Sequence, residues 1–424
     1  MTTNYEKNKN MRILIAGTAN YPALNGQAVF TQNLTEGLAK KGHEVLSIFP
    51  SEIGSAYHTT RNNVHIEALR STNLNRIRSD TYYSLFSERE IEHIFDNFLP
   101  EVVHIQDHFP LCRDVIRVAR RKKVRMIGTN HFMPENLAPY VPIVPHFKPI
   151  YNRVMWGWML DAYNRLDVAT AQSKASAALL RSQGLRIPVF PVSCGIDLAR
   201  FHPDPSVDKA AIRARYGLAP RSTIFLFVGR VDKEKHIDVL LRALHHLNRD
   251  DIQLVITGHG AEQESLINQA KELNLGNRIR FTGFISGDDL PRLLNSVDVF
   301  AMPSEAELLS IASLEAMACA RPVLLANAIA LPELATDGHN GYLFRPGDAI
   351  DAARCMALLA DHPERWQRMG LNSLEKARYH GTVNTIRQYE NLYSALLMRT
   401  YSNIAETEGI SLRPSPVEMV GDKN

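Results

Sequence analysis

Apolar and polar positions alternate in blocks along the first 200 residues, as short apolar runs separated by longer amphipathic stretches. The first run is 11–17, and the stretch after it places Phe30, Leu34 and Leu38 four residues apart, on one helical face. Gly42 follows, where the end of a helix commonly needs a residue in the left-handed conformation. Further runs typical of strands are 44–49, 102–106, 124–129 and 167–172. Apolar strands separated by helices predict a parallel sheet covered on both faces.

The pattern breaks at 188–206 and then starts again. Four prolines interrupt any long element in this stretch, namely Pro188, Pro191, Pro203 and Pro205. We place the linker between two domains here. The strands expected after it are 223–229, 252–258, 278–282, 297–302 and 322–326. The sequence therefore predicts a second α/β unit of similar size.

The whole chain has 424 residues, which fits two or three domains at roughly 100–200 residues each. The predicted segments are a flexible N-terminus at 1–10, a first domain at 11–200, a second domain at 201–382, a last helix at 383–400 and a mobile tail at 401–424. The tail is expected to be mobile because it is polar and contains proline at the end of the chain.

The formal net charge is +3, which is too weak to indicate nucleic acid as a partner. The basic residues are nevertheless concentrated in one place. That cluster consists of Arg117, Arg120, Arg121, Lys122, Lys123 and Arg125. A solvated helix face explains such a cluster, and so does a site for an anionic partner such as a membrane surface or a diphosphate.

Four scattered cysteines form neither a CxxC pair nor a zinc-like spacing with histidine, which fits a reducing compartment. The first ten residues lack the apolar core of a signal peptide. No apolar run approaches the roughly 20 residues that span a bilayer. We expect a cytoplasmic protein, either soluble or peripheral on the inner face of the membrane.

The first candidate motif follows an expected strand and opens a helix, and it contains Glu307 and Glu315, eight residues apart. On a helix this spacing is at most about 12 Å along the axis. Such a pair of carboxylates can reach two separated hydroxyl groups of one extended ligand, and the helix N-terminus between them can hold a phosphate. The alternative is an ordinary amphipathic helix with two surface glutamates.

The second candidate motif is Gly229-Arg230-Val-Asp-Lys-Glu-Lys235, directly after another expected strand. Gly229 allows close approach of the backbone. Arg230 and Lys235 place two positive charges at the carboxyl end of a sheet, where ligands bind in open α/β folds. Two cations there suit a diphosphate leaving group. A charged loop without a ligand is the alternative.

Together the two motifs resemble those of the retaining glycosyltransferases with the GT-B fold, specifically glycosyltransferase family 4. Further markers of the family follow in the same order along nearly the whole chain. They are Asn25-Gly26, the strand entry at 100–104, the interdomain segment at 195–201, the Gly-x-Gly turn at Gly258-His-Gly260 and the loop at 281–285. The resemblance implies two Rossmann-like domains with parallel sheets facing each other across a cleft, the first for the acceptor and the second for the nucleotide sugar. It also implies that the helix at 383–400 crosses back to the first domain.

The resemblance assigns a role to each matching residue. Arg230 and Lys235 would neutralise the donor diphosphate, Glu315 would hydrogen-bond the ribose diol, and Glu307 would meet the transferred sugar. The remaining donor contacts would come from the backbone of Gly26, Gly258, Phe284 and Ile285 and from the sugar-pocket residues Leu308, Leu309 and Ser310. His131 matches the family's active-site histidine, although a lone histidine is more often structural.

No Asp-x-Asp motif is present, which argues against a metal-clamped donor diphosphate. The resemblance implies a same-face displacement in which the departing diphosphate takes the acceptor's proton, without a metal or another cofactor. The donor is expected to be a UDP- or GDP-sugar. Leu308-Leu309 stands where many relatives have Phe-Gly, and this departure leaves the identity of the sugar open.

The acceptor is expected to be a membrane lipid such as diacylglycerol, because the stretch at 130–137 resembles that of lipid-glycosylating members. Aromatic and basic residues at 141–159 and the basic cluster suit an anionic membrane surface, although the same aromatics could pack inside the domain. The alternatives are a soluble sugar, sugar-alcohol or natural-product acceptor, and a non-catalytic nucleotide-sugar-binding protein. An oxidoreductase is disfavoured because the Gly-x-Gly turn lacks the third glycine of a dinucleotide fingerprint.

Overall fold

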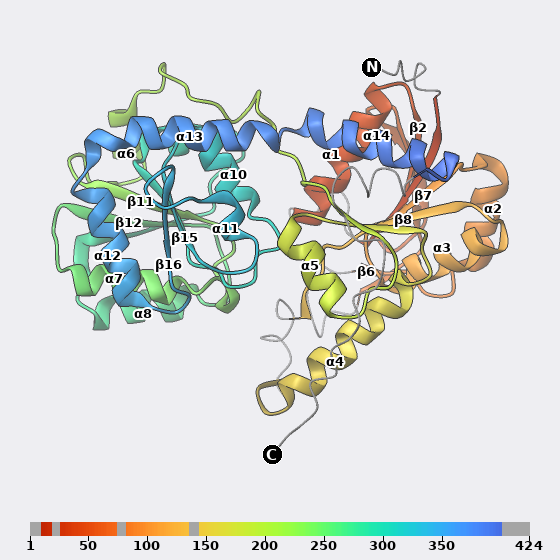
Figure 1. Ribbon diagram of the computed structural model, residues 1–424, viewed down its shortest axis with the longest axis horizontal. Helices are drawn as coiled ribbons and strands as arrows, with labels where there is room; N and C mark the ends of the chain where they lie inside the picture. The colour runs from red at the N-terminus through yellow and green to blue at the C-terminus, as the bar shows by residue number, and fades with distance from the viewer. Residues whose placement is uncertain (1–9, 19–25, 74–81, 135–143, 401–424) are drawn as a thin grey trace. The chain divides into compact units, whose positions relative to one another are not determined.

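A computed structural model of the chain describes residues 10–18, 26–73, 82–134 and 144–400, which form two compact units (Figure 1). Unit 1 contains the chain up to Ser193 and again from Val383, and unit 2 runs from Cys194 to Thr382. The flexible N-terminus predicted up to residue 10 lies, except for that residue, outside the described residues. The tail predicted from residue 401 and Asn25 also lie outside them.

The first change of unit comes seven residues before the predicted boundary at 200. The reason is a short pairing between Ile196 and Gly381. The Ile196 amide donates to the His380 carbonyl at 2.9 Å, and the Thr382 amide donates to the Ile196 carbonyl at 2.9 Å. Because these two bonds join the segment after Ser193 to the end of unit 2, the segment folds with unit 2.

The sheet of unit 1 has eight strands in the order β10-β9-β8-β7-β1-β2-β4-β3. Their bounds are β1 Arg12–Ala16, β2 Glu44–Pro50, β3 Tyr57–Arg61, β4 Val64–Leu69, β7 Val102–Ile105, β8 Arg125–Thr129, β9 Val168–Ala171 and β10 Val189–Pro191. All neighbours are parallel except β3, which pairs antiparallel with β4 at the edge. The predicted parallel sheet thus carries one antiparallel strand at this edge. The pattern of apolar runs misses β3 because most of its side chains face solvent.

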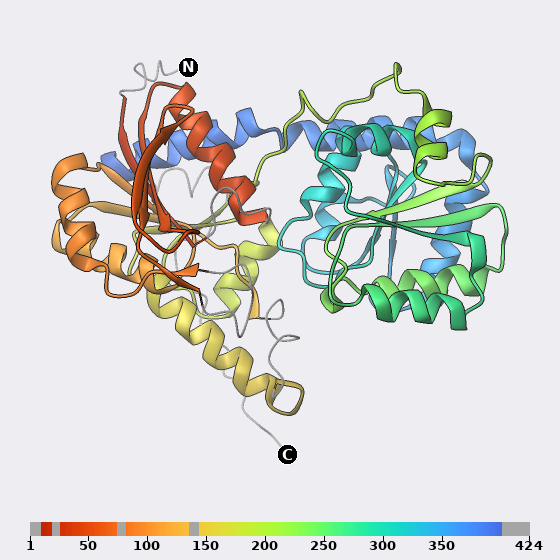
Figure 2. The same cartoon turned by 180° about the vertical axis from the view of Figure 1, so that it is seen from behind.

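Figure 2 shows the helices of unit 1 from behind. They are α1 Gly26–Lys40, α2 Glu88–Phe98, α3 Pro110–Arg121, α4 Val144–Tyr163, α5 Lys174–Ser182 and α14 Thr382–Met398, and a two-stranded ribbon is formed by β5 Thr72–Asn73 and β6 Tyr82–Tyr83. The predicted face of α1 is buried at Phe30, Leu34 and Leu38. Gly42 has a φ of 94°, as expected for the residue that ends this helix.

The C-terminal helix α14 folds as part of unit 1, apart from its first residue. Tyr389 and Tyr393 are fully buried. The Tyr389 hydroxyl lies 2.9 Å from the Thr129 hydroxyl, and that of Tyr393 lies 2.7 Å from His104 Nδ1. Glu390 is also buried and contacts His43 Nε2 at 3.1 Å. Buried polar groups carry a large penalty unless they are paired, so these bonds specify where the helix packs.

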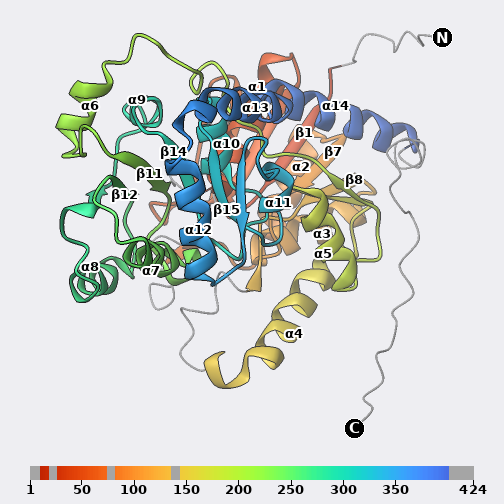
Figure 3. The same ribbon diagram turned by 60° about the vertical axis from the view of Figure 1, so that its left-hand side comes forward.

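The sheet of unit 2 has six parallel strands in the order β13-β12-β11-β14-β15-β16. Their bounds are β11 Thr223–Val228, β12 Ile252–Thr257, β13 Ile279–Gly283, β14 Val299–Met302, β15 Val323–Ala326 and β16 Gly341–Phe344. The helices are α6 Lys209–Arg215, α7 Ile237–Leu247, α8 Gln263–Glu272, α9 Leu290–Ser296, α10 Ile311–Ala318, α11 Leu331–Leu334, α12 Ala349–Ala360 and α13 Trp366–Tyr379. Figures 1 and 3 show α7, α8 and α12 on one side of this sheet and α10 and α13 on the other.

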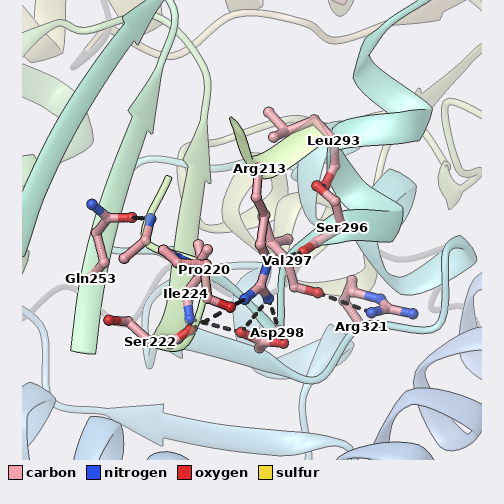
Figure 4. Close-up of polar contacts among 11 residues, drawn as sticks. Arg213, Pro220, Ser222, Ile224, Gln253, Leu293, Ser296, Val297, Asp298 and Arg321 are labelled. Atoms are coloured by element: carbon pink, nitrogen blue, oxygen red, sulfur yellow. Dashed lines mark hydrogen bonds and ion pairs between the residues drawn. The ribbon is translucent and has the colours of Figure 1, made fainter. Parts of the chain in front are cut away.

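The amino ends of β11 and β14 are joined by a polar network centred on Arg213 and Asp298 (Figure 4). Arg213 forks onto both Asp298 carboxylate oxygens at 2.9 and 3.0 Å and donates to the Ser296 carbonyl at 2.8 Å. Asp298 also accepts the Ile224 amide at 2.8 Å. Arg213 and Asp298 therefore make their polar contacts inside the fold. They lie at the amino end of the sheet, whereas α/β folds bind ligands at the carboxyl end.

Candidate functional site

In unit 2, the two motifs meet at the carboxyl ends of β11 and β14. Lys235 ends a short 3-10 turn, Lys233–Lys235, after β11, and Glu307 follows β14. Lys235 Nζ lies 2.6 Å from Glu307 Oε1, and both side chains are largely buried. The family resemblance assigned Lys235 to the donor diphosphate and Glu307 to the sugar. In the structure these two side chains pair with each other.

Arg230 is positioned by two carboxylates that the sequence analysis did not single out. Its guanidinium donates to Asp232 at 2.5 Å and also to Glu234. Asp232 in turn accepts the Ala261 amide at 3.1 Å, which ties Arg230 to the loop after β12. Burial raises the pKa of Glu234, and its Oε2 atom is buried without a hydrogen-bond partner among the described residues. In the sequence, the signal for these partners was the presence of acidic residues two and four positions after the arginine.

Glu307 does not lie on the helix. Helix α10 begins at Ile311, four residues later, so only Glu315 is helical. Leu308 and Leu309 are buried, and Ser310 caps the helix by accepting the Ser313 amide at 3.2 Å. The estimate of a helical rise over eight residues is therefore wrong for this pair, because the cap falls between them.

Glu315 lies in the second turn of α10. Burial raises its pKa to about 7, and the nearby positive charge of Arg200 partly opposes this rise. Because burial disfavours the charged form, a ligand that donates hydrogen bonds to this carboxyl group would favour its ionisation.

The turn at Gly258 and the loop at Phe284 lie next to each other. A Cβ atom at Gly258 would sit 1.9 Å from the Gly229 carbonyl oxygen, and Gly258 has a φ of 129°, so only glycine fits there. The Phe284 amide donates to His259 Nε2 at 3.1 Å, while the Phe284 side chain is exposed and Ile285 is buried. His259, which was not predicted, therefore holds the loop assigned to the base.

In unit 1, His131 lies after β8 with both ring nitrogens occupied. The Gln106 amide oxygen accepts from Nε2 at 2.9 Å, and the Gln172 amide nitrogen donates to Nδ1 at 2.7 Å. Burial lowers the pKa of His131 to about 4, so the ring is neutral at pH 7. The side chain can reach a ligand only if one glutamine changes partner. Gln106 has an amide nitrogen that is buried without a hydrogen-bond partner among the described residues.

Asp107, next to Gln106, joins Thr18 to Gln27. Its Oδ2 accepts from the Thr18 amide at 2.6 Å, from the Thr18 hydroxyl at 2.8 Å and from Gln27 Nε2 at 3.1 Å. Gly26, predicted to contact a donor phosphate, is the exposed first residue of α1. Asp107 was not predicted as a site residue, although polar residues directly after β7 gave the signal.

The described residues, 10–18, 26–73, 82–134 and 144–400, contain neither a metal-binding cluster nor a membrane-spanning helix. Groups of three or more His, Cys, Asp or Glu side chains that could hold a metal ion are absent from these ranges. Within the same ranges, none of the helices combines the length and the apolar character needed to cross a bilayer.

Family models match most of the chain. Residues 24–200 match the model described as Glycosyltransferase Family 4, and residues 208–376 match the one described as Glycosyl transferases group 1. The D-inositol 3-phosphate glycosyltransferase of Nocardia farcinica is 34% identical over 306 residues. The match covers 69% of this chain and 66% of that protein, so the chain spans slightly less than two thirds of that relative.

Solved structures share the fold at low sequence identity. Sucrose-phosphate synthase (tll1590) from Thermosynechococcus elongatus superposes with a TM-score of 0.74 at 20% identity, covering 91% of this chain and 99% of that one. Anabaena Alr3699/HepE in complex with UDP superposes with a TM-score of 0.73 at 18% identity, covering 91% of this chain and all of that one. The predicted GT-B fold is confirmed, and the chain belongs to the GT-B glycosyltransferases of the group 1/family 4 type.

Proposed function

We propose that this chain is a retaining, metal-independent hexosyltransferase that moves a hexose from a nucleotide sugar to a hydroxyl group of a membrane lipid such as diacylglycerol, at the inner face of the membrane. The observation that carries the donor part is the pair of cations, Arg230 and Lys235, beside Glu307 at the carboxyl edge of the unit 2 sheet. Fixed cations at this edge suit an anionic diphosphate.

In this proposal the donor changes the partner of Lys235. The ammonium group is paired with Glu307 at 2.6 Å. A diphosphate would draw Lys235 to its own oxygens, and Glu307 would then be available to the sugar hydroxyls. Arg230 stays oriented by Asp232 and Glu234. Glu315 would accept the ribose hydroxyls, and the loop that His259 holds would contact the base.

The transfer step would break the bond between the sugar's anomeric carbon and the diphosphate oxygen. A bond from that carbon to the acceptor oxygen forms on the same face, and the acceptor's proton passes to the departing diphosphate. Lys235 and Arg230 stabilise the charge that develops on the leaving group. A UDP-sugar is the favoured donor, since the HepE structure of the same fold contains UDP.

A soluble phosphorylated polyol is the second candidate acceptor. It is favoured by the name of the Nocardia relative, which specifies D-inositol 3-phosphate. The neutral hydrogen-bonding groups around His131 suit hydroxyl groups of either acceptor. A nucleotide-sugar-binding protein without catalysis is the alternative of another class.

A donor screen separates these possibilities. UDP-, GDP- and ADP-sugars are incubated with the full chain and vesicles containing diacylglycerol, or with inositol phosphate, and the products are read by mass spectrometry. A glycosylated lipid is the expected product. A glycosylated polyol alone would move the acceptor to the soluble class, whereas binding of a nucleotide sugar without any nucleotide release would overturn the enzymatic proposal.

A further inference from the structure

One face of α4 is apolar and exposed. The exposed fractions are 62% for Ile150, 61% for Val154 and 36% for Trp158, and these residues follow one another at four-residue spacing. Phe147, at the kink before the regular helix, is also exposed. Large apolar side chains gathered on one exposed helix face indicate an interaction surface rather than a solvated one. Figures 1 and 2 show α4 extending away from the sheet of its unit.

The exposed apolar face of α4 has two basic residues beside it. Lys148 and Arg153 are exposed on α4, and neither forms an ion pair within the described parts of the chain. Acidic residues are absent from α4 until Asp161, in its last turn, where the carboxylate pairs with Arg113 and Arg165. The exposed apolar face is therefore flanked by cations, which favours an anionic partner.

The basic cluster on and after α3 does not offer free cations in the same way, because most of its charges form ion pairs with acidic residues of the same unit. Arg121 contacts Glu88 and Glu92 at 2.8 Å, and Lys122 contacts Asp96 at 2.5 Å. Arg117 also pairs with Glu88, and these arginines lower the pKa of that carboxyl group. Arg125 contacts Asp167 at 2.7 Å. For this cluster the structure favours the solvated face over the anionic-partner site.

The inner side of α4 is anchored next to the candidate site of unit 1. The Trp158 ring packs against His108 with centroids 4.5 Å apart, and His108 packs against Phe132 at 4.8 Å. Phe132 directly follows His131. The Arg113 guanidinium lies 5.3 Å from the centre of the Trp158 ring and bonds to the Trp158 carbonyl and to Asp161. The exposed helix is therefore firmly attached to the edge of the sheet that carries His131.

We propose that α4 docks in the interface of an anionic bilayer, with Ile150 and Val154 among the lipid chains, Trp158 at the boundary between lipid and water, and Lys148 and Arg153 at the headgroups. This inference rests on the proposed function and specifies its membrane partner. An amphipathic helix with cations beside an apolar face has the composition of an interfacial helix. A tryptophan at the border of such a face suits the boundary between lipid and water. Docking would hold the His131 edge of unit 1 close to lipid acceptors.

The test compares two double variants of the full chain by vesicle flotation. Ile150→Glu with Val154→Glu places two negative charges on the α4 face. Ile350→Glu with Leu371→Glu is the matched control, because these side chains are 69% and 55% exposed on α12 and α13. The vesicles contain phosphatidylglycerol and phosphatidylcholine, with phosphatidylcholine alone as the reference. Hydrolysis of a nucleotide sugar in the absence of vesicles is measured on the same samples.

We expect the unaltered chain and the control variant to bind the anionic vesicles, and the α4 variant to bind at least about tenfold more weakly. Hydrolysis of the nucleotide sugar should be equal in all three. The docking proposal is overturned if the unaltered chain ignores anionic vesicles, or if both double variants lose binding alike. Normal vesicle binding without hydrolysis by any sample would instead overturn the proposed function and leave the docking surface in place.

Discussion

The two candidate sites of this chain differ in the kind of polar group that they hold. In unit 2, Arg230 and Lys235 are paired with carboxylates at the edge of the sheet. In unit 1, His131 is neutral and is held between two glutamine amides. Both sites lie after parallel strands, so topology alone does not distinguish them. Their charges predict different ligands, an anionic donor for unit 2 and an uncharged hydroxyl group for unit 1.

The two sites also hold their side chains in place in different ways. In the charged site of unit 2, Lys235 forms an ion pair with Glu307. A diphosphate therefore has to compete with Glu307 for the ammonium group. The site of unit 1 is held by side-chain hydrogen bonds, since Asp107 holds Thr18 and Gln27 while two glutamines hold His131. Substitutions in unit 2 should therefore have the largest effects on turnover and nucleotide binding, whereas substitutions in unit 1 should change the positioning of residues or the stability.

The largest expected effect comes from Lys235→Ala. Removal of the ammonium group leaves the developing charge of the diphosphate without its partner, and turnover should fall by about 10³-fold or more. Steady-state release of nucleotide from the donor measures this effect. Lys233→Ala is the matched control, because Lys233 is exposed in the same short turn and should keep nearly normal turnover. Near-normal turnover of the Lys235 variant would remove the leaving-group role from this residue.

Glu315 should make donor binding depend on pH. Its pKa is raised to about 7, so the carboxyl group is mostly protonated at pH 6 and mostly ionised at pH 8. The ionised form can accept hydrogen bonds from both ribose hydroxyls, and the affinity for nucleotide should therefore rise with pH by up to about tenfold. Calorimetric titration at both pH values measures this change. Glu315→Gln should bind weakly and without this pH dependence, and an unchanged pH profile in that variant would exclude the assigned role.

Asp107→Ala should affect the donor through the first loop. Without this carboxylate, Thr18 and Gln27 lose the hydrogen bonds that hold them in place beside Gly26. We expect KM for the donor to rise by a few-fold, to about tenfold, with a smaller change in kcat, because the removed group is a positioning residue rather than a catalytic one. Restoration of KM by Asp107→Asn, which keeps one acceptor oxygen, would support the positioning role. An equal loss of kcat in both variants would contradict it.

The last expected effect concerns the stability of unit 1 in acid and not the reaction. His108 is fully buried, neither of its ring nitrogens has a hydrogen-bond partner among the described residues, and burial lowers its pKa to about 4. The unfolded chain takes up the proton near pH 6.5 and the folded chain does not, so stability is lost as pH falls from about 6.5 to 4.

At pH 5 this single group should cost about 2 kcal/mol of the free energy of unfolding relative to pH 7. His108→Phe, which keeps an aromatic ring between Phe132 and Trp158, should remove that loss. Urea unfolding of both proteins at pH 7 and pH 5 measures the difference. An identical pH dependence of the free energy of unfolding in the variant would show that His108 does not cause the loss of stability in acid.

The sequence predicts the buried strands and the charged motifs because both leave a local pattern. The runs at 223–229 and 252–258 correspond to β11 and β12, and the charged motifs follow β11 and β14. The bond between Lys235 and Glu307 was not predicted. The exposed strand β3 lacks that pattern. The cap at Ser310 places Glu307 before the helix, which a spacing of eight residues does not reveal.

The partners of the predicted residues are harder to predict because they depend on contacts between distant segments. Gln106 and Gln172 both reach His131 from neighbouring strands, 25 and 41 residues away in the chain. The basic cluster reads as one positive surface in the sequence, whereas α2 supplies carboxylates for Arg121 and Lys122 in the fold. The number of basic residues that stay unpaired at the surface therefore depends on how the helices pack.

Calorimetric titration of UDP into the full chain, in the presence of EDTA, tests the central claim most directly. Three samples are compared, the unaltered chain, Lys235→Ala in unit 2 and His131→Ala in unit 1. The account predicts that UDP binds to the unaltered chain and to His131→Ala with similar affinity, and that Lys235→Ala binds at least about tenfold more weakly. Equal binding by all three samples, or a loss confined to His131→Ala, would contradict the assignment of the nucleotide diphosphate to unit 2.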